Sequence, residues 1–251
     1  MIDKPFLIVS DLHLGAVPRE TEAQFRRFLA DTAALASGLL INGDLFDFWF
    51  EYRSVIPAEH FRVLASLADL VESGVPVWFV SGNHDAWGGR FLSEEVGLRL
   101  LEGPEVMNIA GRRTLVAHGD GLGTGDLGYR ALRKLIRHRF TMSAFRWIHP
   151  DWGRRIADKV SATEGRIGDG DMDAARGRAE FIRAWAVDSM NRDPTLDMVV
   201  TGHAHVPALE EVFPGRYFVN SGDWINNFTY VEIPASDGAP RILHWPADPS
   251  N

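Results

Sequence analysis

The sequence predicts an α/β fold in which parallel strands are covered by helices and a helical segment is inserted late in the chain. Over the first hundred residues, short apolar runs alternate with longer amphipathic stretches in the order β-α-β-α-β. From about residue 126 to residue 193, this alternation gives way to helical periodicity with many arginines. Strand-like runs return from residue 197 onwards. We therefore expect one domain, residues 1–251, with an insertion at about residues 126–193.

Local patterns along the chain predict each strand and helix. Apolar runs predict the first three strands at residues 6–10, 39–42 and 75–81. Amphipathic stretches predict helices at about residues 20–36 and 57–73, and a further helix near residues 88–96. Two more runs, separated by the turn-forming Gly111, predict strands at residues 105–110 and 114–118 that continue the same sheet. The last strands are expected at residues 197–201, 208–212, 217–220, 229–233 and 241–245. Gly and Asp residues separate these runs, as in antiparallel hairpins.

The composition excludes several classes of protein. The 26 basic and 34 acidic residues give a net charge of −8, which argues against a surface built wholly for nucleic acid. Because the chain has no cysteine, any bound metal must be held by oxygen and nitrogen atoms. No apolar run reaches the roughly 18 to 20 residues that cross a bilayer, and the first predicted strand leaves no room for a signal peptide before it. We expect a cytoplasmic protein with at most peripheral contact with a membrane.

Polar motifs follow five of the predicted strands, where the carboxyl ends of parallel strands would bring them together. In chain order they are Asp11-Leu12-His13, Gly43-Asp44, Gly82-Asn83-His84-Asp85, Ala117-His118-Gly119-Asp120 and Gly202-His203-Ala204-His205. In Asp-x-His and His-x-His, an extended backbone would point both side chains the same way. A single histidine after a strand is more often structural than a ligand. Five of the nine histidines lie in these motifs, however, and the set therefore indicates a metal site.

In their order, these motifs resemble the signature of the calcineurin-like metallophosphoesterases: Asp-x-His, Gly-Asp, Gly-Asn-His-Asp, His and Gly-His-x-His. The resemblance covers about residues 5–233, without the insertion. It implies a β-sandwich flanked by helices in αββα layers, with the insertion as a helical lid, and two divalent metal ions bridged by Asp44. By matching positions, one ion would be held by Asp11, His13, Asp44 and His205, and the other by Asp44, Asn83, His118 and His203. Such oxygen and imidazole ligands suit Mn²⁺, Fe or Zn²⁺, of which we expect Mn²⁺.

This arrangement suits the hydrolysis of phosphoesters. A shared carboxylate holds two ions roughly 3.5 to 4 Å apart, and such a pair activates a bridging hydroxide and neutralises phosphate oxygens. The hydroxide can then attack phosphorus in line. We expect His84 to protonate the leaving oxygen or to stabilise its charge, with Asp85 orienting the His84 ring.

The segment after His118 resembles one group within the family, the enzymes of lipid A synthesis that hydrolyse the pyrophosphate of UDP-2,3-diacylglucosamine to UMP and 2,3-diacylglucosamine 1-phosphate. In those enzymes a His-Gly-Asp segment leads through an Asp and a Tyr into the lid, and Asp126 and Tyr129 match these positions. Residues 129–160 carry nine Arg and Lys against two Asp, with apolar residues interleaved, which favours an anionic lipid. We expect Asp126, Tyr129, Arg133 and Arg137 to contact this nucleotide-sugar lipid.

Other functions remain open at this point. The lipid pyrophosphohydrolases have Arg at the position of His84, and a histidine suits an alkoxide leaving group better. A soluble metal-dependent phosphodiesterase or phosphatase of small molecules is therefore the alternative, and the lid would then be an amphipathic helical pair with a solvated basic face. A nuclease is a third reading. A non-catalytic, protein-binding relative is a fourth, but it predicts missing ligands, whereas all seven are present.

Overall fold

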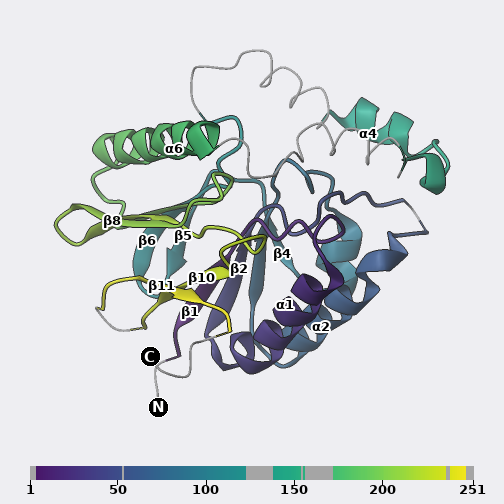
Figure 1. Ribbon diagram of the computed structural model, residues 1–251, viewed down its shortest axis with the longest axis horizontal. Helices are drawn as coiled ribbons and strands as arrows, with labels where there is room; N and C mark the ends of the chain where they lie inside the picture. Colours follow the sequence, from purple (N-terminus) through teal and green to yellow (C-terminus); the bar gives the residue numbers. More distant parts are fainter. Residues whose placement is uncertain are drawn as a thin grey trace.

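Two stacked β-sheets with helices on their outer faces form the molecule (Figure 1). This computed structural model describes residues 4–52, 54–122, 138–153, 155, 172–235 and 238–246. The α/β class and the helix-flanked sandwich expected from the sequence are confirmed.

The first sheet has six strands in the order β11-β10-β1-β2-β3-β4. They are β1 (Phe6–Val9), β2 (Gly38–Asn42), β3 (Val77–Val80), β4 (Arg99–Leu101), β10 (Thr229–Ile233) and β11 (Arg241–His244). Strands β1 to β4 run parallel to one another, with Val9 beside Ile41 and Asn42 beside Val80. This register brings the carboxyl ends of β1, β2 and β3 together. The sequence did not predict β4, because this edge strand is short and its first two residues are exposed.

The second sheet has five strands in the order β5-β6-β7-β9-β8. They are β5 (Glu105–Ile109), β6 (Arg112–Val116), β7 (Met198–Thr201), β8 (Ala208–Phe213) and β9 (Arg216–Asn220). We expected β5 and β6 to continue the first sheet, and this was wrong: β6 pairs instead with β7, more than eighty residues later in the chain. An apolar run predicts that a strand forms but does not identify its partner.

Apolar side chains are buried in three layers. Alternate residues of β1 point to opposite faces: Phe6 and Ile8 pack between the sheets, while Leu7 and Val9 pack toward α1 (Arg19–Asp31) and α2 (Phe61–Glu72). The second sheet is covered by α6 (Met172–Arg192), whose Ile182 and Met190 are buried against it. Because both faces of these strands are buried, the loops at their ends start from rigid positions.

The remaining described elements are short. They are η1 (Ala33–Leu35), η2 (Ala58–His60), η3 (Phe91–Glu95) and α4 (Arg139–Phe145). The helix expected near residues 88–96 is only the five-residue turn η3, which is π-helical. Both α4 and α6 lie within the expected insertion, whose limits stay a prediction. Among the described helices, none is both long enough and apolar enough to cross a bilayer.

Candidate metal centre

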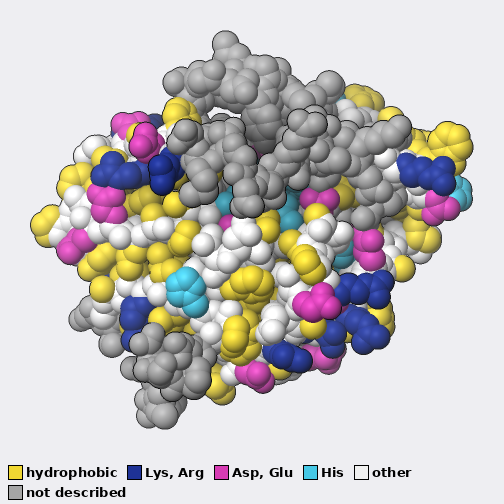
Figure 2. Space-filling view, in the orientation of Figure 1, with side chains coloured by type: hydrophobic (Ala, Val, Ile, Leu, Met, Phe, Trp, Pro, Cys, Tyr) yellow, Lys and Arg dark blue, Asp and Glu magenta, His cyan; other side chains and the backbone are white. Residues whose placement is uncertain are grey.

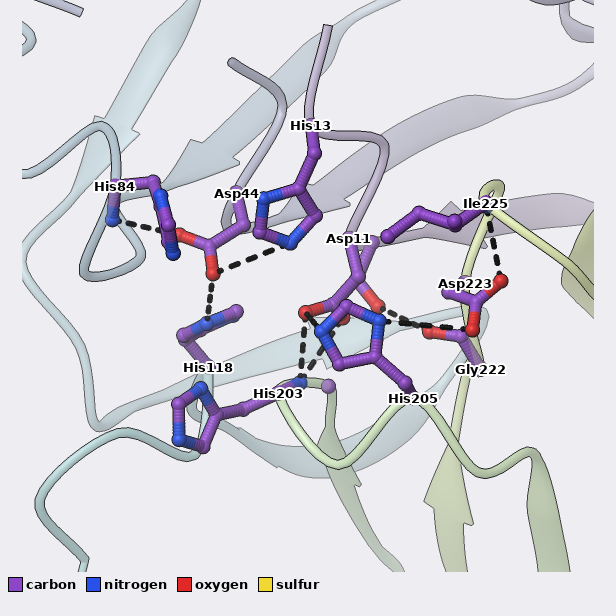
Figure 3. A network of polar contacts seen from close by, with 12 residues as sticks. Asp11, His13, Asp44, His84, His118, His203, His205, Gly222, Asp223 and Ile225 are labelled. Atoms are coloured by element: carbon purple, nitrogen blue, oxygen red, sulfur yellow. Dashed lines mark hydrogen bonds and ion pairs between the residues drawn. The ribbon is translucent and has the colours of Figure 1, made fainter. Parts of the chain in front are cut away.

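The candidate ligands converge where the strand ends of the two sheets meet (Figure 3). His118 Nε2 lies 3.0 Å from Asp44 Oδ2, and His13 Nε2 lies 3.8 Å from the same oxygen. His205 Nε2 lies 3.6 Å from Asp11 Oδ1. His203 donates its backbone N–H to both carboxylate oxygens of Asp11, at 3.1 and 2.9 Å. The structure thus gathers side chains that are almost two hundred residues apart in sequence.

Three sets of side chains place their ligand atoms within 4.8 Å of one another. They are Asp11 with His13 and His205, Asp44 with His118 and His203, and His13 with Asp44 and His84. The first two sets contain most of the two ligand groups expected from the sequence, and Asp44 of the second set lies 3.8 Å from His13 of the first. Asn83 lies in the turn between Gly82 and His84, whose N–H groups bind Asp85 and Asp44. The third set shows that His84 is also within reach of an ion.

A test of whether a metal fits here comes from His13. Its side chain is almost fully buried, yet within the described residues neither of its ring nitrogens has a hydrogen-bond partner. Burying a polar nitrogen without a partner is costly, and native structures seldom do so unless a ligand binds there. The carboxylates and imidazoles gathered around His13 are oxygen and nitrogen ligands, which fit divalent metal ions.

The backbone that carries these side chains is strained. Positive φ angles occur at five candidate ligands: Asp11 (55°), His13 (47°), Asp44 (53°), His203 (64°) and His205 (59°). The extended conformation that we expected for Asp-x-His and His-x-His was therefore wrong. Left-handed conformations cost on the order of 1–3 kcal/mol at residues other than glycine, and they persist where the surrounding structure enforces them, often at functional sites. Here they turn each side chain inward directly after its strand.

Close packing of two loops depends on Gly82. A Cβ atom at this position would lie 2.0 Å from Asp44 Oδ1 and 2.6 Å from the backbone nitrogen of Asp44. The glycine therefore lets the loop after β3 lie directly against the loop after β2.

The carboxylate of Asp85 joins two loops. It is fully buried and accepts hydrogen bonds from backbone N–H groups of both loops, at 2.8 Å from Gly82 and 2.7 Å from Leu45. Its expected action on the His84 ring stays a prediction. Asp47 contacts that ring: its backbone oxygen lies 2.9 Å and its Oδ1 3.5 Å from His84 Nδ1. A second aspartate three residues after Asp44 was the signal that could have identified this contact.

In His118 and His205, Nε2 faces a candidate carboxylate ligand, and the other ring nitrogen, Nδ1, lies near a different oxygen atom. His118 Nδ1 lies 2.8 Å from the backbone oxygen of Asn42, so Nε2 faces Asp44. His205 Nδ1 lies 3.5 Å from Oδ2 of Asp223, a residue that the sequence did not reveal. Asp223 follows a glycine after a strand, as Asp44 does, and this was the available signal. Such partners fix which nitrogen of a histidine is available to a metal.

Burial and neighbouring charges shift the pKa values in this centre. Burial alone would raise the pKa of Asp44, but His118 outweighs it and the pKa lies well below its ordinary value. Burial alone would lower the pKa of His118, but the Asp44 carboxylate raises it well above its ordinary value. Burial, reinforced by the charge of His118, lowers the pKa of His203 to about 3, so that this ring is neutral, as a metal ligand must be. Burial, together with the Asp44 charge, raises the pKa of Asp85 to about 6.

His60 supports the loop that follows Asp44 and gives the fold a predictable pH dependence. Its buried ring packs 4.4 Å from the Phe46 ring, and burial lowers its pKa from 6.5 to about 4 despite a backbone hydrogen bond to Phe48. Between these two pH values the unfolded chain binds the proton more readily than the folded chain, so stability rises with pH. The stability that the neutral His60 ring contributes is fully present above pH 6.5 and is lost as the pH falls toward 4.

We predict that His60→Phe, which keeps an aromatic ring at this position, abolishes that pH dependence. Relative to the variant, the parent should lose about 2 kcal/mol of unfolding free energy between pH 7 and pH 5. Urea unfolding at several pH values measures this difference. Parallel stability profiles for the two proteins would show that His60 is not responsible.

The fold and these clusters define a class of protein, the metal-dependent phosphoesterases. Residues 4–207 match the sequence model of the calcineurin-like phosphoesterases, and the chain belongs to this family of metal-dependent hydrolases. It is 31% identical over 244 residues to the UDP-2,3-diacylglucosamine hydrolases of Escherichia coli O6:H1 and O7:K1, covering 96% of this chain and 98% of each relative. A solved predicted phosphoesterase from Streptococcus pneumoniae aligns over 99% of this chain and 93% of its own, with 13% identity and a TM-score of 0.46.

Four of the expected site residues, Asp126, Tyr129, Arg133 and Arg137, lie outside the described residues.

Proposed function

We propose that this chain hydrolyses the pyrophosphate of UDP-2,3-diacylglucosamine, so that water and substrate give UMP and 2,3-diacylglucosamine 1-phosphate. The observation that carries this proposal is the 31% identity to hydrolases of that name over 96% of the chain. An alignment of this length includes most of the insertion, and the similarity is therefore not limited to the metal motifs.

In this proposal two Mn²⁺ ions bind, one at Asp11, His13, Asp44 and His205 and the other at Asp44, Asn83, His118 and His203. When bound, the ions would activate water and neutralise phosphate oxygens. His84 acts on the oxygen that leaves with the lipid phosphate. Because its Nδ1 contacts Asp47, we assign Nε2 to that oxygen. A phosphate leaving group needs positive charge more than a proton, and Asp47 supports a charged ring.

A cavity of about 470 Å³, which Phe48 helps to line, supports a lipid substrate. One wall consists of Phe48, Phe50 and Tyr52, and the lining also includes His149, Pro150, Asp151 and Gly153. Phe48 directly follows Asp47, so the cavity begins next to the residue that contacts His84. Apolar, concave walls of this kind suit acyl chains.

The test is Mn²⁺-dependent hydrolysis of UDP-2,3-diacylglucosamine in detergent, run beside bis-p-nitrophenyl phosphate, with products identified by mass. We expect release of UMP with a kcat/KM far above that for the aryl ester. Cleavage of the aryl ester alone would contradict the lipid substrate. It would favour the second candidate, a phosphodiesterase of small molecules, for which His84 is the supporting observation because a histidine can protonate an alkoxide.

We predict that His84→Ala lowers kcat by about 10²- to 10⁴-fold and leaves the metal content unchanged. The reason is that His84 acts on the leaving group while other residues hold the ions. Turnover and metal content should be measured on the same preparation. Since His84 also lies within reach of an ion, loss of metal from the variant would mean that it is a ligand.

The proposed enzyme works at the inner membrane, where its substrate resides. Around α4, three aromatic side chains are strongly exposed: Phe140 (75%), Trp147 (91%) and Trp152 (66%). Figure 2 shows hydrophobic and basic side chains next to one another at this end of the molecule. Tryptophan and arginine together suit the interface of an anionic bilayer.

We predict that the double variant Trp147→Ala/Trp152→Ala binds phosphatidylglycerol vesicles about tenfold more weakly, with unchanged hydrolysis of the aryl ester. Phe181→Ala, an exposed aromatic on α6, is the control and should bind vesicles like the parent. Flotation with vesicles measures the binding. Equal binding by all three proteins would exclude this surface as the membrane contact.

A further inference from the structure

Asp223 lies behind the ring of His205, on the side away from the other candidate ligands. It is almost completely buried, and its Oδ2 is 3.5 Å from His205 Nδ1. The other ring nitrogen, Nε2, lies 3.6 Å from Asp11 Oδ1. The ring is thus held between two carboxylates, Asp11 in front and Asp223 behind (Figure 3).

The Asp223 carboxylate is itself held in place. Its Oδ1 accepts the backbone N–H groups of Ile225, Asn226 and Asn227, at 2.8 to 3.0 Å. The Asn227 amide donates both to Oδ2, at 3.0 Å, and to the backbone oxygen of His205, at 3.1 Å. Turning the carboxylate would break these bonds, so Oδ2 stays directed at the His205 ring.

An ionised carboxylate can only accept hydrogen bonds. His205 Nδ1 faces Oδ2 in an ion-pair contact of 3.5 Å, which favours the proton on Nδ1 and leaves Nε2 with the lone pair that a metal needs. Of the two ligand groups assigned above, only the group with Asp11, His13 and Asp44 contains His205. Within the described residues, no hydrogen bond or ion pair of Asp223 reaches His118 or His203 of the other group.

We propose that Asp223 is a positioning residue that holds His205 in its metal-binding tautomer and so strengthens one of the two metal positions. The proposal rests on the metal-dependent function proposed above. The alternative is a purely structural role, in which Asp223 only caps the turn at residues 225–227.

Asp223→Asn separates the two roles. The Asn Oδ1 can still accept the three backbone N–H groups, but its amide presents a donor to His205 Nδ1 and gives up the hydrogen bond that Oδ2 accepts from the Asn227 amide. The ring then favours the tautomer with the proton on Nε2, which cannot bind metal. Metal-free protein should be titrated with Mn²⁺ alone, with free Mn²⁺ followed by electron paramagnetic resonance. We expect one equivalent to bind about 10- to 100-fold more weakly, with the affinity for the other equivalent unchanged.

Asp193→Asn is the matched control. This carboxylate also caps a turn, accepting the Thr195 N–H at 3.0 Å, and its variant should bind Mn²⁺ like the parent. Unchanged affinity for both equivalents in Asp223→Asn would overturn the proposal. So would equal weakening of both together with a lower melting temperature, because that result indicates a cap alone. A parent protein that binds no Mn²⁺ would instead contradict the function on which the proposal rests.

Discussion

Replacing Asp44 by alanine is expected to lower kcat/KM by more than about 10³-fold and to release metal from both positions. Asp44 belongs to two of the three sets of side chains that can hold an ion, and its Oδ2 lies 3.0 Å from His118 and 3.8 Å from His13. Its loss removes a negatively charged ligand from each position at once. Turnover of bis-p-nitrophenyl phosphate and metal content after gel filtration measure the two effects.

The control for this variant is Asp188→Ala. Asp188 is an exposed carboxylate on α6 that pairs with Arg192, and its removal should leave activity and metal content at the parent's level. If Asp44→Ala still bound two equivalents with the parent's affinity, Asp44 could not be the bridging ligand.

Gly43→Ala is expected to disrupt the centre without removing any ligand. Gly43 has φ +89°, and a Cβ atom here would lie 2.3 Å from His118 Nδ1. The His118 ring would have to move, breaking its 2.8 Å contact with the Asn42 backbone oxygen and leaving Asp44. We expect a loss of about 3 kcal/mol in unfolding free energy and a drop of at least about 10²-fold in turnover.

Gly74→Ala separates backbone strain from crowding. Gly74 has a similar φ of +95°, but a Cβ atom there would meet nothing within 4 Å. This variant should lose only about 1 kcal/mol, the cost of placing alanine in a left-handed conformation, and should keep full activity. Denaturant unfolding and turnover of both variants test the comparison. Equal losses of stability would mean that the contact with His118 contributes nothing.

Local sequence patterns were sufficient for most strands of the fold. Strands such as β1 and β3 are buried on both faces, so their sequences are short apolar runs that stand out from the surrounding residues. The edge strand β4 has no such run, since Arg99 and Leu100 are exposed. The pairing of β6 with β7 was not predictable, because it depends on the partner and not on either strand alone.

Of the residues in the metal centre, the sequence likewise predicted some and missed others. The candidate ligands were identified because chemistry restricts them to Asp, Asn and His directly after strands. Asp47 and Asp223 were missed because the histidines they contact lie in other loops, and a single aspartate in a loop has many uses. Asp85 was identified, but the hydrogen bonds it accepts from two loops were not, since they come from backbone N–H groups, which every residue except proline has.

The convergence of both sheets on one centre also sets an order of events in the cell. Asp11 and Asp44 come from the first sheet, whereas His118 and His203 come from the second. His203 donates to Asp11 across 192 positions of sequence. Since synthesis proceeds from the N-terminus, a growing chain has Asp11 and Asp44 long before it has β7. Before β7 and the loop after it have been made, the nascent chain lacks His203 and His205, one ligand of each proposed group, so both proposed metal positions are complete only after translation has passed His205.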